Sequence, residues 1–309
     1  MPADVPPPSA YPARPVRLLV PFPPGGSTEF TARTVAEALQ EILDQPFIVE
    51  PRVGDAGLTA LRELLHADAY TLMVGSVNTN SIAPVVFRRE MDFDYDAAIV
   101  GVSRLAEFPR VLVTGSSARA IALPEFIAAA RTARGKVKNG TDWIGSYPDI
   151  DAVLLGKAAG FAVVNLPKAG GAEGLLAALI NGELDMLFLN VRTASMAAGA
   201  GHVTPLAVTG PTRLPAFPDV PTLEESGFSG IGTRHWHGLF ASSRTSGEIV
   251  DLLHGAVTRA LNSDEVRARF EWVGARVATS ASPRQFAEEL REERARWERI
   301  VADIDLAVT

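Results

Sequence analysis

The sequence contains no cysteine among its 309 residues, and this absence excludes several kinds of site. Without thiols the chain forms no disulfide, binds no metal through thiolates and has no cysteine nucleophile. Excess positive charge is also missing, because 29 Lys and Arg stand against 36 Asp and Glu, a formal net charge of -7. A nucleic-acid surface needs a basic stripe, so we expect no nucleic-acid partner.

Long apolar runs and common catalytic motifs are missing as well. No apolar run reaches the length of a transmembrane helix. The sequence holds no GxSxG, no HExxH and no strand-end serine with a His and Asp pair. His235 and His237 alternate along one strand without a third ligand, so we expect a buried strand with two partly exposed histidines and no metal site. These absences predict a protein that is not an enzyme and carries no cofactor.

What is present is an alternation of short apolar runs and helical patterns. With 47% hydrophobic residues, the chain can build one large or two ordinary domains. The first part predicts strands at 16–22, 47–49 and 71–74 and helices at 27–43 and 58–65. The second predicts strands at 111–115, around 137, at 162–166 and 186–189, and helices at 124–133, 150–159 and 172–180. These patterns indicate α/β lobes, each a mostly parallel sheet covered by helices.

The two ends of the chain have a different character. Residues 1–10 are rich in proline and predict a disordered leader, as would remain after removal of an export signal. Residues 211–228 carry four prolines and predict a meandering connection. A strand at 235–242, an amphipathic helix at 249–261 and a long helix at 283–304 follow.

The stretch LLVPFPPGGSTEF, residues 18–30, joins a strand to a helix through prolines and glycines. Prolines fix φ, while Gly25 and Gly26 permit positive φ and let a ligand approach the main chain. The first N–H groups of the helix lack intrahelical acceptors, so an anion is their natural occupant. Glu29 in the first helical turn favours the helix dipole. A plain tight turn is the alternative for a single Pro-Gly corner.

A second polar corner, GSVNTNS at 75–81, follows another strand end of the same lobe. Its small hydrogen-bonding side chains stand where a helix should begin. One or two of them would cap that helix. Because neighbouring strand ends open onto one crevice, the others could complete a site for a carboxylate or an amide.

Several stretches, in order, resemble the Bug-type periplasmic substrate-binding proteins of tripartite tricarboxylate transporters. They are YPARPVRLLVPFPPGGSTEFTARTVAEAL, FIVEPRVGDAGLTA, DAYTLMVGS, LPKAGGAEGLLAALINGELDMLF, PLAVTGPTRLPAFPDVPTLEESGF and WHGLFA. The resemblance implies a two-lobe periplasmic binding protein-like fold of type II, with crossing hinge strands and a ligand in the inter-lobe cleft. After the leader at 1–10, lobe 1 would comprise 11–113 and 238–309, and lobe 2 would comprise 114–237.

The resemblance also implies which residues hold the ligand, through main-chain amides and small side chains. In lobe 1 these are Phe22, Pro24, Gly25, Gly26 and Ser27 in the first loop and Ser76, Val77 and Asn78 in the second. In lobe 2 they are Thr141, Gly145, Ser146, Lys168, Ala169, Gly170 and Asn190. Trp143 departs from the relatives and could form the floor of a pocket for an aromatic acid. Lys168 is either a ligand cation or a solvated lysine.

The function implied is that of a monomeric periplasmic solute-binding protein. It would capture a small carboxylated metabolite and deliver it to the membrane permease subunits of a tripartite transporter. Where relatives usually have small residues, Asp142 and Trp143 stand here, and Asp149 replaces a histidine. An aromatic acid or an amino acid therefore remains open beside a plain dicarboxylate. The alternatives are a small-molecule sensor for a signalling partner and, on the same scaffold, an enzyme.

Overall fold

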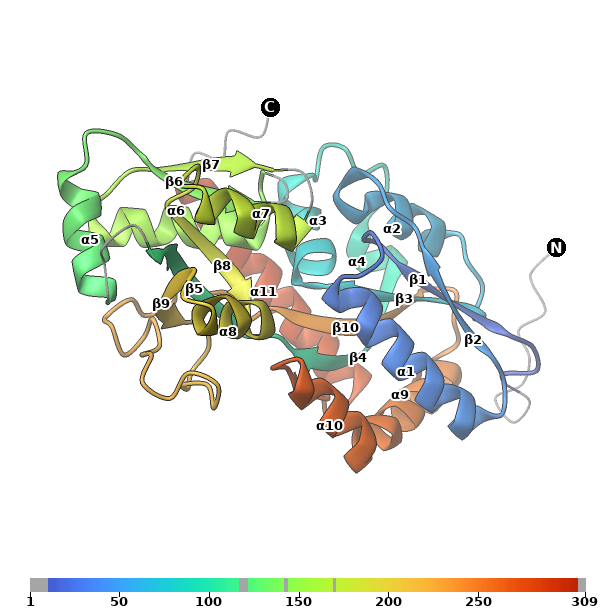
Figure 1. The fold of residues 1–309 in the computed structure, drawn as a ribbon. Helices are drawn as coiled ribbons and strands as arrows, with labels where there is room; N and C mark the ends of the chain where they lie inside the picture. The colour runs from blue at the N-terminus through green and yellow to red at the C-terminus, as the bar shows by residue number, and fades with distance from the viewer. Residues whose placement is uncertain (1–10, 117–121, 142–143, 169–170, 305–309) are drawn as a thin grey trace. The chain divides into compact units, whose positions relative to one another are not determined.

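The computed structural model describes residues 11–116, 122–141, 144–168 and 171–304 (Figure 1). The chain divides into two compact units. Within the described ranges, the first combines residues 11–107 with Trp236–Val301, and the second combines Phe108–His235 with residues 302–304. Among the described residues, no helix combines the length and apolar character that crossing a membrane requires.

The first unit is built on a six-stranded sheet. Its order is β11-β4-β10-β3-β1-β2, formed by Arg276–Val277, Ile99–Glu107, Trp236–Ser242, Thr71–Ser76, Val16–Val20 and Phe47–Pro51. Strand β1 runs parallel to β2 and β3, whereas β10 runs antiparallel to β3 and β4. The helices are α1 (Ser27–Leu43), α2 (Leu58–Leu65), α3 (Ala83–Val86), α4 (Tyr95–Ala98), α9 (Gly247–Leu261), α10 (Asp264–Trp272) and α11 (Pro283–Asp303).

Helices cover both faces of this sheet. His237 on β10 hydrogen-bonds to Thr31 on α1, while a Cβ at the next residue, Gly238, would lie 2.8 Å from the Phe286 ring of α11. Because successive strand residues point to opposite faces, α1 and α11 lie on opposite sides. Burial on both faces explains why Leu18 and Leu19 of β1 are both inaccessible to solvent.

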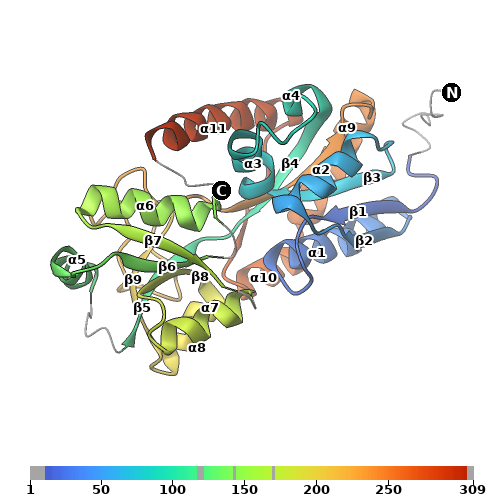
Figure 2. The same cartoon turned by 90° about the horizontal axis from the view of Figure 1, so that it is seen from above.

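The second unit has a five-stranded sheet of order β7-β6-β8-β5-β9, drawn mostly in green and yellow in Figure 2. The strands are Val163–Pro167, Val137–Thr141, Met186–Asn190, Arg110–Gly115 and Val203–Val208. The helices are α5 (Leu123–Thr132), α6 (Tyr147–Ala159), α7 (Gly171–Ile180) and α8 (Val191–Gly199). Leu112 belongs to one apolar cluster and its neighbours Val111 and Val113 to another, so this sheet also has a core on each face.

The predicted α/β fold class is confirmed, but the prediction of mostly parallel sheets is wrong. Both sheets are mixed, because β10, β4 and β11 join the first sheet antiparallel and β5 pairs antiparallel with both β8 and β9. Parallel pairing is limited to the β1, β2 and β3 group and to the β6, β7 and β8 group. The carboxyl ends of these parallel strands carry the candidate binding loops.

Candidate ligand-binding site

The first corner in the first unit leads from β1 into α1. Gly25 has φ +91°, a left-handed conformation that favours glycine. Gly26, the N-cap, has φ −84° and ψ 169°, which is ordinary extended backbone, so only Gly25 uses the positive φ that both glycines permit. No side chain caps α1, and Pro24, Gly25 and Gly26 are exposed. The first N–H groups of α1 are therefore open to an acceptor from outside the helix.

The side chain of Glu29, in the first turn of α1, forms a hydrogen bond with this corner. Its Oε2 accepts the backbone N–H of Gly25 over 2.6 Å, and its Oε1 accepts from Nη2 of Arg33 over 2.6 Å. The N–H of Gly25 and, second, the Arg33 guanidinium lower the pKa of the Glu29 carboxyl. Arg33 also balances its charge, so the carboxylate adds no net negative charge beside the open N–H groups.

The second corner, after β3, is largely bonded to itself. The N–H of Ser76 donates to Thr79 Oγ1 over 3.0 Å and to Asn80 Oδ1 over 3.2 Å. Asn80 in turn donates from Nδ2 to the hydroxyl of Tyr95 over 2.8 Å. Gly75 makes room for this amide, because a Cβ there would lie 1.9 Å from Asn80 Oδ1. Thr79 and Asn80, two of the polar residues that we expected either to cap the next helix or to complete the site, are structural groups of this corner.

A π-helical turn, Asn78–Ile82, follows β3 and is held by α11. Ser81 donates its hydroxyl to Glu293 over 2.5 Å, and the indole N–H of Trp236 donates to the same carboxylate over 3.0 Å. Burial raises the pKa of Glu293, and the two hydrogen bonds act in the opposite direction. The final long helix therefore fixes the position of the second corner.

The hydroxyl of Ser76 takes no part in this hydrogen-bond network. Ser76 is fully buried, and its Oγ has no hydrogen-bond partner among the described residues. Ser76 stands directly opposite His237 in the antiparallel pair of β3 and β10, so both side chains lie on one face of the sheet. His237 reaches Thr28 and Thr31 of α1, over 3.3 and 2.7 Å. The Ser76 hydroxyl therefore lies on the face that the first turns of α1 cover.

The loop after β2 brings the two corners together. A Cβ at Gly57 would lie 2.4 Å from Cγ2 of Thr79 and 3.4 Å from Cβ of Pro21. The residues before it include Asp55 and Ala56, which have φ +48° and +52° although they are not glycines. This loop fills the space beside both corners, and our sequence analysis did not single it out.

The second unit begins α6 with the same local arrangement as α1. Gly145 has φ +88°, Ser146 is the N-cap, and Oδ2 of Asp149 accepts the N–H of Gly145 over 2.9 Å. No side chain caps α6, since the Ser146 hydroxyl instead lies 3.0 Å from Thr141 Oγ1. The N–H of Lys168 donates to the carbonyl of Thr141 over 3.1 Å. Residues predicted from two separate stretches of lobe 2 thus meet at the ends of β6 and β7.

Comparison with known proteins identifies the family. The family described as tripartite tricarboxylate transporter family receptor matches residues 31–306. The chain belongs to this receptor family. Protein BugT of Bordetella pertussis is 30% identical over 295 residues, which cover 95% of this chain and 90% of BugT. The resemblance to Bug-type binding proteins is thereby confirmed.

Several solved structures share the fold of this receptor. MatC from Rhodopseudomonas palustris, solved with bound malate, has a TM-score of 0.82 and 30% identity, covering 94% of this chain and 100% of MatC. An R. palustris protein solved with adipate has a TM-score of 0.84 and 28% identity, covering 94% of this chain and 97% of its own. A structure described as a periplasmic transporter has a TM-score of 0.86 and 27% identity, covering 96% of this chain and 99% of its own.

Two predicted ligand residues of the receptor have internal partners. Nζ of Lys168 forms an ion pair with Glu183 at 2.6 Å, and this hydrogen bond is the main reason why the pKa of Glu183 is lowered. Asn190 caps α8, accepting the N–H of Thr193 on Oδ1 over 2.8 Å. Phe22 and Ser27 are partly exposed, whereas Val77 and Asn78 are buried. Trp143, Ala169 and Gly170, like Asp142, lie outside the described residues.

An aromatic cluster in the second unit was not anticipated. The ring of His235 stacks on Tyr147, the first residue of α6, with centroids 4.9 Å apart. Nη2 of Arg110 lies 3.4 Å from Nδ1 of His235. His235 is 5% exposed and His237 fully buried, so our expectation of two partly exposed histidines is wrong. The alternating pattern HWHG predicted a strand but could not show that both faces are covered.

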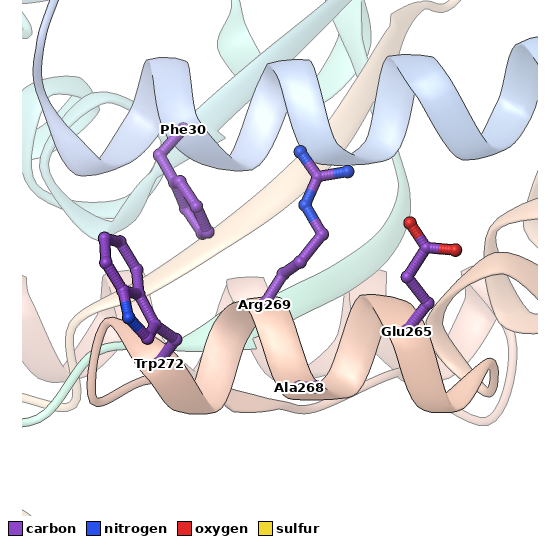
Figure 3. Close-up of a pocket in the computed structure, with 5 residues that line it drawn as sticks. All are labelled: Phe30, Glu265, Ala268, Arg269 and Trp272. Carbon is purple, nitrogen blue, oxygen red and sulfur yellow. The ribbon is translucent and has the colours of Figure 1, made fainter.

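A surface hollow of about 480 Å³ lies between α1 and α10 (Figure 3). Its lining residues are Phe30, Glu265, Ala268, Arg269 and Trp272. Phe30 and Trp272 point toward one another, and Arg269 forms an ion pair with Glu37. Among the described residues, no group of three His, Asp or Glu side chains is placed to hold a metal ion.

Proposed function

We propose that this receptor is a periplasmic solute-binding protein that captures a small carboxylated metabolite and delivers it to the membrane permease subunits of a tripartite transporter. The family match and the relatives solved with malate and adipate support this proposal. On the same grounds we infer a receptor rather than an enzyme. The individual solute, and the role of each candidate residue, are part of the proposal.

The observation that carries the proposal is the uncapped start of α1 beside the buried Ser76 hydroxyl. An uncapped helix N-terminus offers N–H donors and a partial positive charge to an anion. The Ser76 hydroxyl lacks a partner inside the protein, and a buried polar group without one costs free energy until a ligand supplies it. A carboxylate, with up to four lone pairs, would satisfy both kinds of donor.

This chemistry does not require a free cation at the first corner. Arg33 is already paired with Glu29, so the anion would be bound mainly by neutral N–H and O–H donors. Hydrogen bonds to a charged acceptor contribute about 1.5–3 kcal/mol each. In the second unit, the uncapped N-terminus of α6 with Thr141 and Ser146 offers the same kind of donors to an acidic or polar group.

The decisive experiment combines native mass spectrometry of the purified protein with calorimetric titration. We expect a co-purified acid, or saturable binding of at least one of malate, adipate, benzoate and glutamate. Ligand binding to the folded state should also raise the melting temperature with ligand concentration. The absence of any co-purified solute, together with no heat and no thermal shift across these acids, would reject the proposal.

A further inference from the structure

Both units start the helix of their candidate loop with the same hydrogen bond. In the first unit, Glu29 accepts the N–H of Gly25 over 2.6 Å; in the second, Asp149 accepts that of Gly145 over 2.9 Å. The carboxylate stands four positions after the glycine in both cases. Both glycines are left-handed, with φ +91° and +88°. The sequences of the two loops, PPGGSTEF and WIGSYPDI, show this common spacing only once the glycines are aligned.

This arrangement differs from an ordinary helix cap by one position. In a capping box, the acidic side chain at the third helical position accepts the N–H of the N-cap residue itself. Here Glu29 and Asp149 occupy that third position, but each accepts from the residue before the N-cap. The N–H groups of the N-caps, Gly26 and Ser146, have no acceptor among the described residues.

Each carboxylate therefore binds one N–H and leaves the next one open. A carboxylate that simply capped its helix would instead compete with the solute for the same N–H groups. In the first unit, its charge is balanced by Arg33, whose Nη2 lies 2.6 Å from Glu29 Oε1. The unpartnered Ser76 hydroxyl on the same face of the sheet is independent evidence that polar groups here are kept for a ligand.

We propose that Glu29 and Asp149 are positioning residues for solute binding, which hold the glycine N–H so that the following N–H groups remain directed at an acidic group of the solute. This inference rests on the proposed function. The two carboxylates do not contact the solute; they fix the peptide planes that do. Without this hydrogen bond, the Gly-Gly segment of the first unit is flexible in the free protein. Binding then weakens, because the solute must order this segment at a cost in conformational entropy.

The test is a calorimetric titration of variants of the full chain with malate and adipate as probes. Glu29→Ala removes the acceptor, and we expect about tenfold weaker binding, the effect of one lost hydrogen bond. Glu29→Asp should stay within about twofold of the wild type, because an aspartate makes the same bond in the second unit. Glu29→Gln keeps one acceptor oxygen, and the side chain of Arg33, 58% exposed, can turn to water, so binding should also be retained.

A matched control lies on the same helix. Glu37→Ala removes a carboxylate of α1 that pairs with Arg269 instead of a loop N–H, and we expect unchanged affinity. Hydrogen exchange of residues 22–28 without solute gives a second readout: exchange should be faster in Glu29→Ala and unchanged in Glu29→Asp and Glu37→Ala. Asp149→Ala and Asp149→Asn repeat the comparison in the second unit, with loss and retention of affinity, respectively.

The outcomes separate this inference from the proposed function. If the wild type co-purifies with no solute and binds neither these two acids nor benzoate and glutamate, the proposed function fails and the inference with it. If the wild type binds and Glu29→Ala binds equally well, only the inference is overturned. If Glu29→Gln and Glu29→Asp are as weak as Glu29→Ala, the hydrogen bond is not what matters, and the inference is again overturned.

Discussion

Ser76 and His237 lie directly opposite each other on β3 and β10, both fully buried, but only His237 reaches α1. The imidazole contacts Thr28 and Thr31, whereas the Ser76 hydroxyl has no partner among the described residues. The other polar groups of this corner are well hydrogen-bonded, so the Ser76 hydroxyl stands out as a buried donor without an acceptor among the described residues. Such a group needs an explanation, and a bound acid provides one.

Two serines of the second corner should respond oppositely to replacement by alanine. Ser76→Ala removes an unsatisfied hydroxyl, so we expect the free energy of unfolding to stay equal or rise by about 1 kcal/mol, while acid binding weakens at least about tenfold. Ser81→Ala removes the donor to Glu293 and should cost about 1–3 kcal/mol of stability. Urea unfolding and calorimetry of the two variants check this. Unchanged affinity in Ser76→Ala would remove Ser76 from the site.

The loop after β2 should tolerate glycine better than alanine. Gly57→Ala places a Cβ 2.4 Å from Thr79 Cγ2 at a residue with φ +97°, so we expect a loss of about 2 kcal/mol or more in the free energy of unfolding. Ala56→Gly removes the strain of an alanine in the left-handed conformation, but glycine also raises the entropy of the unfolded chain. The free energy of unfolding should therefore rise by less than about 1 kcal/mol. Equal stability of both variants in urea would contradict the conformation described for this loop.

Glu293 should make stability depend on pH. Burial raises its pKa above the ordinary value, so the folded protein holds this proton more tightly than the unfolded chain. Its contribution to stability is full below the unfolded pKa of about 4.5 and is lost as pH rises through the folded pKa. We therefore expect Glu293→Gln, which keeps an acceptor for Ser81 and Trp236, to raise the melting temperature at pH 7 and to lose this gain near pH 4. Melting curves across that range test the sign.

The ion pair of Lys168 with Glu183 should limit how strongly this lysine can bind an acid. If Lys168 is a ligand cation, Glu183 competes with the solute for it, so we expect Glu183→Gln to bind acids more tightly and Lys168→Ala more weakly. Stability should change little in both, because the pair is on the surface and is screened by solvent. Equal affinities of both variants and the wild type would show that Lys168 is a solvated lysine.

Periodicity predicted those elements whose burial is one-sided and strong. The helix bounds 27–43 and 58–65 agree with α1 and α2, because regular apolar spacing and a short polar or glycine loop at each end define them. Strand β4 was missed because its sequence, IVGVSRLAE, includes a glycine and charged residues. Helix α10 was missed because it buries only Val266 and Phe270 in a polar sequence.

The candidate site shows a similar division. Strand ends followed by Pro-Gly or Ser-Asn corners could be found from the sequence, since topology places them at one edge of a sheet. The sequence could not show which polar groups form hydrogen bonds within the corner. The side chains of Thr79 and Asn80 do, whereas the hydroxyl of Ser76 does not. Which groups are hydrogen-bonded depends on residues far away in the chain, such as His237 and Glu293. At the starts of α1 and α6, it also depends on carboxylates that accept the N–H of the residue before the N-cap instead of that of the N-cap itself.

The partner of Ser81 comes 212 positions later in the chain, on the last long helix. During synthesis, the turn at 78–82 is therefore made long before the carboxylate that holds it, and the Ser81 hydroxyl lacks this acceptor until 283–303 has emerged and docked. A chain that ends before 283–303 would still contain β1, β3 and α1, but its second corner would be incomplete.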